Sequence, residues 1–451
     1  MKMEKRRREG DVGGEFLGSC IDWSLLTFII LVLLLESTTT TSLEFNFTRY
    51  NTRVSSLKLA RIQEHLKKIN KPSSRTIEVC QTSCVTFLIF IFITYTSFIM
   101  KRLYFQSIDG DIIDCVHMHK QPALDHPLLK NHKIQKVPPV RPRLDPRHRN
   151  YTSNILSRRA WQTWHKTGHC PRGTVPIRRT SADDILRAKS IFHYGKKTVL
   201  RPTDRPARFT EAPDVVSGNG HEHAIAYTGT GEYYGAKATI NVWDPSIQVT
   251  NEFSLSQMWV LSGSFDSDLN SIEAGWQSDA YQATGCYNLL CSGFVQTNSK
   301  IAIGAAISPI SSYSGDQYDI TILVWKDPKL GNWWLGFGDN TLVGYWPAEL
   351  FTHLADHADM VEWGGEIVNT KSSGKHTATQ MGSGHFAEDG FRQASYFRNI
   401  EVVDADNSLS PVQSLSTLAE DTNCYNIQSS YNTDWGNFFY FGGPGNNAQC
   451  P

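Results

Sequence analysis

Runs of alternating apolar and polar residues, separated by turn residues, dominate the chain from Gly218 onward. The alternation has a period of two, as expected of strands that bury one face and leave the other polar. It predicts strands at 236–242, 253–260, 301–307, 318–325, 333–337, 360–368 and 400–403. Short strands punctuated this regularly are typical of an all-β antiparallel β-sandwich, within which we expect one short helix at 347–354.

The chain ahead of this region has a different pattern. Between Ser55 and Asn70, apolar residues recur every three or four positions among charged ones, and Lys71-Pro72 follows as a stop. This spacing predicts a short amphipathic helix. A helix-start signature at 180–184 predicts a second helix over 185–191. We therefore expect a smaller α+β domain in front of the sandwich.

A stretch of distinct composition lies between the two regions: 201–213 holds three prolines and three arginines and has no apolar period. Such a stretch is typical of a linker open to proteolytic processing, with the front domain at 43–200 and the sandwich at 214–451. The front region is dense in Lys, Arg and His between Lys130 and Arg208. Over all 451 residues, 44 Lys and Arg balance 44 Asp and Glu, so charge gives no case for a nucleic-acid partner.

Two long apolar runs lie in the first quarter of the chain. Leu25 to Leu35 follows a basic start and is shorter than the roughly 20 residues that span a bilayer. It favours a signal peptide at 1–42, with a signal anchor as the alternative. The second run, 85–100, lies within a segment, 79–106, whose removal joins two ordinary polar stretches. That segment is either a translated intron or a genuine membrane segment, and only the second interpretation gives the protein a membrane contact.

Export makes the nine cysteines readable as disulfides. Cys20 would leave with the signal peptide, and Cys80 and Cys84 lie in the 79–106 segment. The other six are Cys115, Cys170, Cys286, Cys291, Cys424 and Cys450. Six thiols allow about 15 pairings. Position favours Cys115 with Cys170, Cys286 with Cys291, and Cys424 with Cys450. A zinc site is the alternative, but no second Cys/His pair stands at ligand spacing beside the middle two. Glycosylation sequons begin at Asn46 and Asn150.

Histidines gather in the front region and recur at the start of the sandwich. His117, His119, His126 and His132 stand among prolines at irregular spacing, which favours surface histidines on a loop over a metal site. Such a cluster is also suited to sensing acid. His221 and His223 share one face of a strand, which is a weak metal signal without further ligands. We predict neither a metal nor any other cofactor.

The remaining candidates for chemistry are carboxylates, because the chain has no Gly-x-Ser-x-Gly elbow, no His-Glu-x-x-His and no phosphate loop. Within 271–277 the alternation places Glu273 on a polar strand face beside a glycine. Glu366 follows two glycines that allow close approach of a backbone or a substrate. For each glutamate taken singly, a solvated strand carboxylate is the alternative.

Six stretches also carry a resemblance to a known family: DGDIIDC at 109–115, HCPRGTVPIRR at 169–179, YGAKATINVW at 234–243, SIEAGW at 271–276, ATGCYNLLC at 283–291 and QMGSGHF at 380–386. With these motifs the chain resembles the neprosin family of secreted plant proteins from about Thr48 to its end, apart from 79–106. The resemblance implies an activation peptide ahead of a β-sandwich glutamic peptidase that cleaves next to proline in acid. By position, Glu273 and Glu366 match the two catalytic glutamates. The pairs Cys286 with Cys291 and Cys424 with Cys450 match the disulfides of the catalytic domain.

Two carboxyls that face a common water can share one proton, because like charges held close do not both ionise. The ionised carboxylate would take a proton from the attacking water, and the protonated one would donate to the carbonyl oxygen or the leaving amine. An acidic optimum follows. Gln257, polar on its strand, is either a satisfied core amide or a group that orients the water or stabilises the oxyanion.

One departure from the family pattern lies beside Glu273. Family members carry a turn and a further aromatic strand after the Gly-Trp motif, whereas here Gln277 joins Ser278 directly. A missing strand would expose an edge next to the catalytic one.

The sequence therefore favours a secreted acid glutamic endopeptidase, made as a zymogen and inhibited by its own activation peptide. The alternatives are a two-carboxylate cell-wall glycoside hydrolase and a catalytically impaired binding or structural module. The endopeptidase would act on proline-rich peptides or proteins in the apoplast or cell wall, with the vacuole as the alternative compartment.

Overall fold

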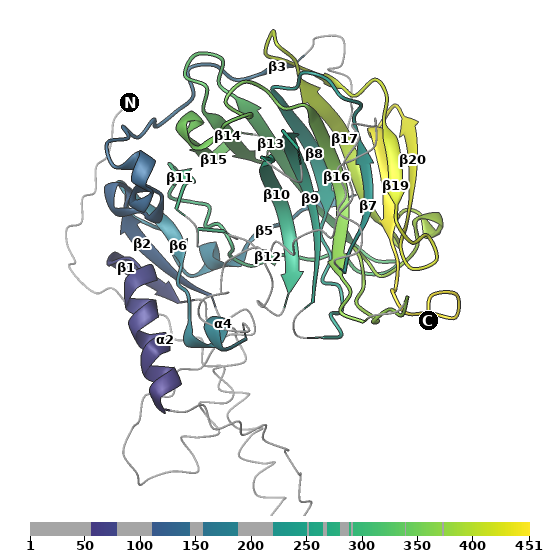
Figure 1. Ribbon diagram of the computed structural model, residues 1–451, viewed down its shortest axis with the longest axis horizontal. Coiled ribbons are helices and arrows are strands. Elements are labelled where there is room, and N and C mark those ends of the chain that lie inside the picture. The colour runs from purple at the N-terminus through teal and green to yellow at the C-terminus, as the bar shows by residue number, and fades with distance from the viewer. Residues whose placement is uncertain are drawn as a thin grey trace, which may run out of the picture. The chain divides into compact units, whose positions relative to one another are not determined.

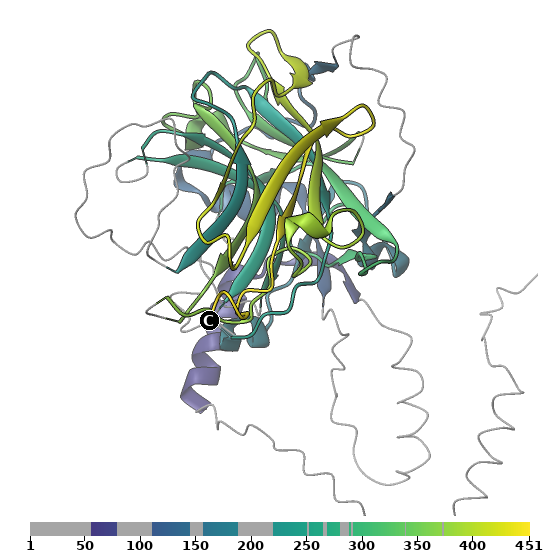
Figure 2. The same cartoon turned by 90° about the vertical axis from the view of Figure 1, so that its right-hand side faces the viewer.

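Two large β-sheets face each other across an apolar core in the C-terminal part of the chain (Figures 1 and 2). The computed structural model describes residues 56–78, 111–144, 157–187, 220–249, 252–264, 268–279, 288–289, 292–338, 340–371 and 374–451. All of them belong to one compact unit, Ser56–Pro451. The expectation of an all-β antiparallel sandwich behind a smaller α+β segment is confirmed.

The first large sheet has five strands in the order β10-β9-β16-β7-β19. Its strands are β7 His221–Tyr227, β9 Phe253–Ser262, β10 Asn270–Asp279, β16 Met360–Val368 and β19 Ser416–Ala419. All neighbouring strands in it pair antiparallel. Within the described chain β10 forms one edge, and β9 lies between β10 and β16.

The second large sheet has eleven strands, with a main path β11-β15-β14-β13-β8-β17-β18-β3. Strand β21 pairs with β17, β20 with β21, and β4 with β13. The bounds are β3 Arg143–Leu144, β4 Ser157–Arg159, β8 Gly235–Asn241, β11 Val295–Gln296, β13 Gln317–Lys326, β14 Trp333–Phe337, β15 Thr341–Trp346, β17 Ser395–Val403, β18 Ser408–Pro411, β20 Asn426–Asn432 and β21 Gly436–Gly442.

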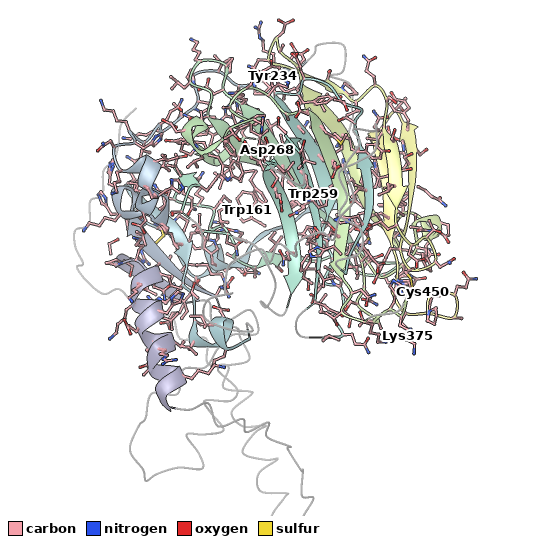
Figure 3. The ribbon with its side chains drawn as sticks, in the orientation of Figure 1. Trp161, Tyr234, Trp259, Asp268, Lys375 and Cys450 are labelled. Atoms are coloured by element: carbon pink, nitrogen blue, oxygen red, sulfur yellow. A yellow bond between two sulfur atoms is a disulfide. The ribbon has the colours of Figure 1, made fainter. Side chains whose placement is uncertain are left out.

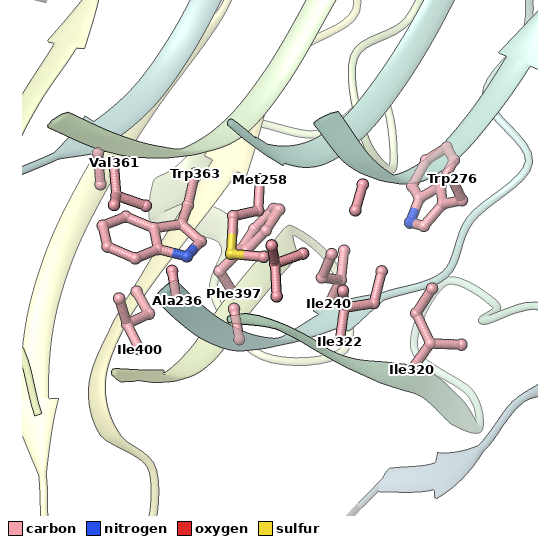
Figure 4. Close-up of a cluster of buried hydrophobic side chains, with 14 of the residues drawn as sticks. Ala236, Ile240, Met258, Trp276, Ile320, Ile322, Val361, Trp363, Phe397 and Ile400 are labelled. Carbon is pink, nitrogen blue, oxygen red and sulfur yellow. The ribbon is translucent and has the colours of Figure 1, made fainter. Parts of the chain in front are cut away.

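The core between the sheets is filled by alternate residues of their facing strands. Met258 and Trp363 from the five-stranded sheet meet Ile240, Ile322 and Phe397 from the eleven-stranded sheet (Figure 4). Burying an aliphatic or aromatic side chain of this kind contributes about 1.5–3 kcal/mol. Because side chains alternate along a strand, the same burial turns the intervening residues of β9 and β16 to the opposite face of the five-stranded sheet.

The front segment, residues 56–187 as far as they are described, builds a small sheet of its own. Its order is β1-β2-β6, and α2 and α4 are its helices. The bounds are α2 Ser56–Ile69, β1 Ser73–Glu78, β2 Ile112–His117, β5 Trp161–Gln162, β6 Thr174–Arg178 and α4 Ala182–Arg187. A disulfide joins Cys115 to Cys170 within this segment, as expected.

The front segment is joined to the sandwich by strand pairing and by shared cores. Strand β4 adds to β13, β3 adds to β18, and β5 pairs with β12, Ile307–Ser308. Gln121 and Gln296 exchange two hydrogen bonds, of 3.1 and 2.7 Å. Ala123 and Leu129 pack in one cluster with Trp334 and Tyr345. These contacts reach the eleven-stranded sheet and the loops around it.

Short helical turns fill several connections. They are the 3-10 helices η1 Met118–Lys120, η2 Pro122–Asp125, η3 Pro127–Leu129, η5 Thr163–Lys166, η6 Ala348–Leu350 and η7 Ala387–Asp389. The predicted helix at 347–354 is thus a single turn, η6. Among the described residues, no helix is both long and apolar enough to cross a membrane.

One predicted strand, 301–307, is wrong. Ile301, Ala302 and Ala305 are buried as the pattern implied, but only Ile307 belongs to a strand. Side chains of the front segment and its surroundings take up the backbone groups instead: Ala302 is bonded at both its N–H and its carbonyl by the Gln162 amide. An apolar run shows burial, and it does not show which partner supplies the hydrogen bonds.

Candidate active site

The predicted carboxylates lie on the face of the five-stranded sheet that is turned away from the main core. Residues 255, 257 and 259 of β9 define three successive rows across this face. Trp259 pairs with Glu273 of β10 and with Glu362 of β16. Two residues along β9, Gln257 pairs with Gly275 and Gly364, and Leu255 pairs with Gln277 and Glu366. We call the middle row, Gly275–Gln257–Gly364, the glycine row.

The glycine row carries only one side chain, that of Gln257. A Cβ added at Gly275 would lie 2.1 Å from the Ser256 carbonyl oxygen, and one at Gly364 would lie 2.3 Å from the Ala224 carbonyl oxygen. Neither position has room for a larger residue without displacing a neighbouring strand. The row therefore carries no side chain on either side of one amide, with Gly275 exposed and Gly364 buried.

Glu273 is half-buried and held by two neutral side chains. Ser271 donates a hydrogen bond from Oγ to its Oε1 at 2.9 Å, and Gln257 donates from Nε2 to its Oε2 at 3.1 Å. Ser271 comes from the same face of β10, and Gln257 comes from the glycine row. The carboxylate is thus oriented by its own strand and by the neighbouring one.

Glu366 is buried beside two histidines of β7. Its Oε1 contacts Nδ1 of His221 and lies 3.8 Å from Nε2 of His223. His223 is held in turn by Glu420, just beyond β19: its backbone N–H donates to Oε2 of Glu420 at 2.7 Å, and its ring Nδ1 lies 3.0 Å from the same oxygen. This arrangement links Glu366 to a second carboxylate through an imidazole.

The surroundings of His223 favour its charged form. Burial lowers the pKa of His223, but the hydrogen bond to Glu420 and the negative charges of Glu366, Glu420 and Glu362 outweigh burial, so that the pKa lies above its usual value. A cationic imidazole next to Glu366 favours the ionised form of that carboxylate.

Three glutamates share this face, and the register distinguishes them. Glu273 and Glu362 are level with each other, but the side chain of Trp259, labelled in Figure 3, belongs to the same face between them and is buried in an apolar cluster. The diagonal from Glu273 to Glu366 crosses the glycine row instead. In a flat sheet that diagonal spans roughly 16 Å between Cα atoms, from two strand spacings of about 4.8 Å and four residues of about 3.3 Å.

The two predicted glutamates have separate hydrogen-bonding partners. Each carboxylate is engaged by its own partners, Glu273 by Ser271 and Gln257 and Glu366 by His221. The expectation that the two carboxyls share a proton through a common water stays a prediction.

Gln257 lies on β9, between the strands of the two carboxylates, and its amide is satisfied by the hydrogen bond to Glu273. Sequence reasoning gave no role to Ser271, Glu362 or Glu420. Two of these three had a signal in the alternation, since Ser271 shares a strand face with Glu273, and Glu362 with Glu366. Glu420 had none, because only the pairing of β19 with β7 brings it to His223.

Of the remaining predicted residues, Cys424 and Cys450 form a disulfide near the chain end. Cys286, Cys291, Asn46 and Asn150 lie outside the described residues, as do the segments 1–42, 79–106 and 201–213. The front-segment histidines take separate local roles: His117 and His126 each accept a backbone hydrogen bond at 3.3 Å, and His132 contacts the Tyr345 hydroxyl at 2.8 Å.

The glutamates, and the front segment from residue 111 onward, fall within regions that match known family models. The neprosin profile matches residues 250–444, and the profile of the neprosin activation peptide matches 104–227. The chain belongs to the neprosin family. An activation peptide ahead of a neprosin domain is the organisation of a peptidase made as a zymogen.

The structure draws the boundary of the neprosin sandwich slightly earlier than the profiles do. Strand β7 lies at the end of the activation-peptide match, yet it pairs with β16 and β19 of the sandwich. His221 and His223 therefore belong structurally to the neprosin domain.

Two solved structures are also similar to part of the chain. One is SCP-B, a member of the eqolisin family of peptidases in complex with the tripeptide Ala-Ile-His, at 10% identity and a TM-score of 0.26 over 49% of this chain and 97% of that one. The other is scytalido-glutamic peptidase with a peptide-based transition state analog, at 10% identity and a TM-score of 0.27 over 50% of this chain and 98% of that one.

Proposed function

We propose that this protein is a secreted, acid-active glutamic endopeptidase that cleaves next to proline and is made as a zymogen. One observation carries the proposal: Glu273 and Glu366 lie on the same sheet face, on opposite sides of a strip of backbone that holds a single amide. An extended peptide can lie against such a strip with a carboxylate at each side. Catalysis by carboxylates also agrees with the absence of other catalytic motifs in the sequence.

In the proposed reaction, a water above Gln257 attacks the scissile carbonyl carbon. The ionised carboxylate takes one proton from that water, so that a C–O bond forms as the O–H bond breaks. The protonated carboxyl donates its proton to the amine as the C–N bond breaks. The amide N–H of Gln257, between the two carboxylates, is placed to stabilise the oxyanion of the tetrahedral intermediate.

The pH dependence follows from this division of roles. One carboxyl has to be protonated and the other ionised, so activity falls when pH rises above the pKa of the donor or drops below the pKa of the base. An acidic optimum is expected for two glutamates, whose ordinary pKa is about 4.3.

The activation peptide is the proposed intramolecular inhibitor. Its described residues pair with the eleven-stranded sheet, and the chain then runs through 201–213 to β7, whose first residue contacts Glu366. Cleavage in 201–213, followed by departure of the front segment, is proposed to free the glycine row for substrate. Charging of front-segment histidines in acid is proposed to weaken the inhibitory contacts.

The test is cleavage of a proline-containing peptide by the purified, acid-processed protein at low pH. Glu273→Gln and Glu366→Gln are expected to abolish cleavage, whereas Glu349→Gln, a substitution at an exposed carboxylate, is expected to retain it. Glu362→Gln tests which glutamate of β16 acts together with Glu273. This variant is expected to leave substantial activity, because Trp259 stands between Glu362 and Glu273. Full activity of both Glu273→Gln and Glu366→Gln would exclude the proposed site.

The same preparations address the other two functions. Release of sugars from cell-wall polysaccharide, with no peptide product, would assign the carboxylates to glycoside hydrolysis. A cooperatively folded wild-type protein that cleaves neither substrate would indicate a binding or structural module.

A further inference from the structure

Beyond the two carboxylates, a cluster of polar side chains surrounds His223. It comprises His221 and His223 of β7, Glu362 and Glu366 of β16, and Glu420 beyond β19. The cluster is asymmetric with respect to the proposed dyad, because Glu366 belongs to it and Glu273 receives its hydrogen bonds from Ser271 and Gln257.

We propose that His223, anchored by Glu420, is a positioning residue that keeps Glu366 ionised and turned toward β7, so that Glu366 acts as the general base. The inference rests on the proposed function and assigns the two carboxylates their separate roles. Glu273 then supplies the proton to the leaving amine.

The geometry of His223 supports this role. Two bonds to one oxygen of Glu420, from the backbone N–H and from ring Nδ1, fix the orientation of the ring. With Nδ1 committed to Glu420, Nε2 is the nitrogen that faces Glu366, at 3.8 Å from Oε1. His223 also pairs directly with Glu366 in the β7–β16 register, so the strands themselves hold the two residues together.

The groups that face the pair are two further carboxylates and a second imidazole. His223 faces the carboxylates Glu366, Glu362 and Glu420, which favour its protonated form, and His221 contacts Glu366 from the other side. On β9, the residue level with Glu366 is the neutral Leu255. A positive charge next to a carboxylate lowers its pKa, and a base with a lower pKa stays active further into acid.

Removal of the imidazole charge should therefore shift the acid side of the pH profile. In acid-processed His223→Gln, the acid limb of kcat/KM for a proline-containing peptide is expected to move up by about one pH unit. At pH values below the acid limbs of both proteins, this shift equals about a tenfold loss of kcat/KM in the variant relative to the wild type. The alkaline limb, set by the proton donor, is expected to stay in place. His385→Gln is the matched control, because His385 pairs with Asp389 on the surface, and it should keep the wild-type profile.

A second measurement needs no activity and so separates this inference from the proposed function. The imidazole titration of His223, followed by NMR in the full protein, is expected to have a midpoint above the ordinary value of about 6.5 and to fall in Glu420→Gln. A wild-type acid limb in His223→Gln, or a His223 midpoint at or below its ordinary value, would overturn the assignment. Peptidase inactivity of the wild type would instead defeat the proposed function alone, since the titration would still report on His223.

Discussion

Gln257 donates a hydrogen bond to Glu273 across 3.1 Å from the one side chain of the glycine row. The amide is buried, with 8% of its surface exposed, and it sits on the strand that separates the two proposed catalytic glutamates. This contact gives the amide two functions in the proposed reaction. It orients Glu273, and it presents an N–H to the charge that develops on the substrate.

The first prediction concerns this amide. Gln257→Ala is expected to lower kcat by about 10²–10³, the usual loss for one oxyanion donor, with a smaller effect on KM. Peptide cleavage across the acidic range is the measurement. Gln428→Ala, at an exposed position of β20, should leave both constants unchanged. An unchanged kcat in Gln257→Ala would show that the amide takes no part in the chemical step.

The second prediction concerns the bare backbone beside Gln257. Gly275→Ala would bring a Cβ to 2.1 Å from the Ser256 carbonyl oxygen, so β10 has to move away from β9 and carry Glu273 with it. We expect a loss of about 1–3 kcal/mol in the free energy of unfolding and a large loss of cleavage. Urea unfolding gives the first quantity.

Gly229 provides the matched control for this substitution. A Cβ at Gly229 meets nothing within 4 Å, so Gly229→Ala should unfold at the wild-type urea concentration and cleave normally. Equal stability of the two variants would contradict the close approach of β10 and β9.

The third prediction concerns the acid response of the front segment. Burial raises the pKa of Asp184, but the charge of Arg178 and the hydrogen bonds from Ser181 outweigh burial, and the pKa lies below its usual value. A depressed pKa means that the ionised carboxylate stabilises the fold above its unfolded value of about 3.9, and that this stability is lost as pH falls further. The front segment should therefore weaken below about pH 4.

Asp184→Asn tests this relationship. Between pH 5 and pH 3, the variant should lose less unfolding free energy than the wild type, by on the order of 1 kcal/mol. Asp125→Asn, at an exposed partner of Lys71, should respond to pH as the wild type does. If Asp184→Asn responds to acid like the wild type, the acid sensitivity of the front segment has another origin, such as its histidines.

The fourth prediction concerns processing. Intact mass and N-terminal sequencing of the acid-treated product should place the new N-terminus within 201–213, because that stretch combines prolines and arginines outside any predicted element. The mass of the unprocessed protein would also show whether 79–106 is translated. A new N-terminus beyond His221 would remove part of β7 and is incompatible with the proposed site.

The sequence predicted the strands of the sandwich well, because their alternation is set by burial on one face. Phe253–Ser262 and Met360–Val368 agree closely with their predicted ranges, and Ser56–Ile69 agrees with the helix. The helix start near Thr180 is also confirmed: Ser181 and Asp184 cap each other, with the Asp184 backbone N–H donating to Ser181 Oγ at 3.1 Å.

The sequence did not predict which residues of neighbouring strands pair with each other. The alternation places Glu273, Glu362 and Glu366 on polar faces of their strands, but only pairing with β9 shows that Trp259 is level with the first two and that the glycine row lies between Glu273 and Glu366. The contact between His223 and Glu420 depends on the same kind of long-range pairing.

The way the front segment is attached has a consequence for its release. Its strands β3 and β4 pair with β18 and β13 of the eleven-stranded sheet, β5 pairs with β12, and Ala123 and Leu129 pack in one cluster with Trp334 and Tyr345. Cleavage of one peptide bond leaves all of these strand pairings and core contacts intact. We therefore expect the protein, once cleaved as proposed, to remain a complex of two chains. The front segment would leave only when these contacts open together, and it would be able to bind again as an inhibitor.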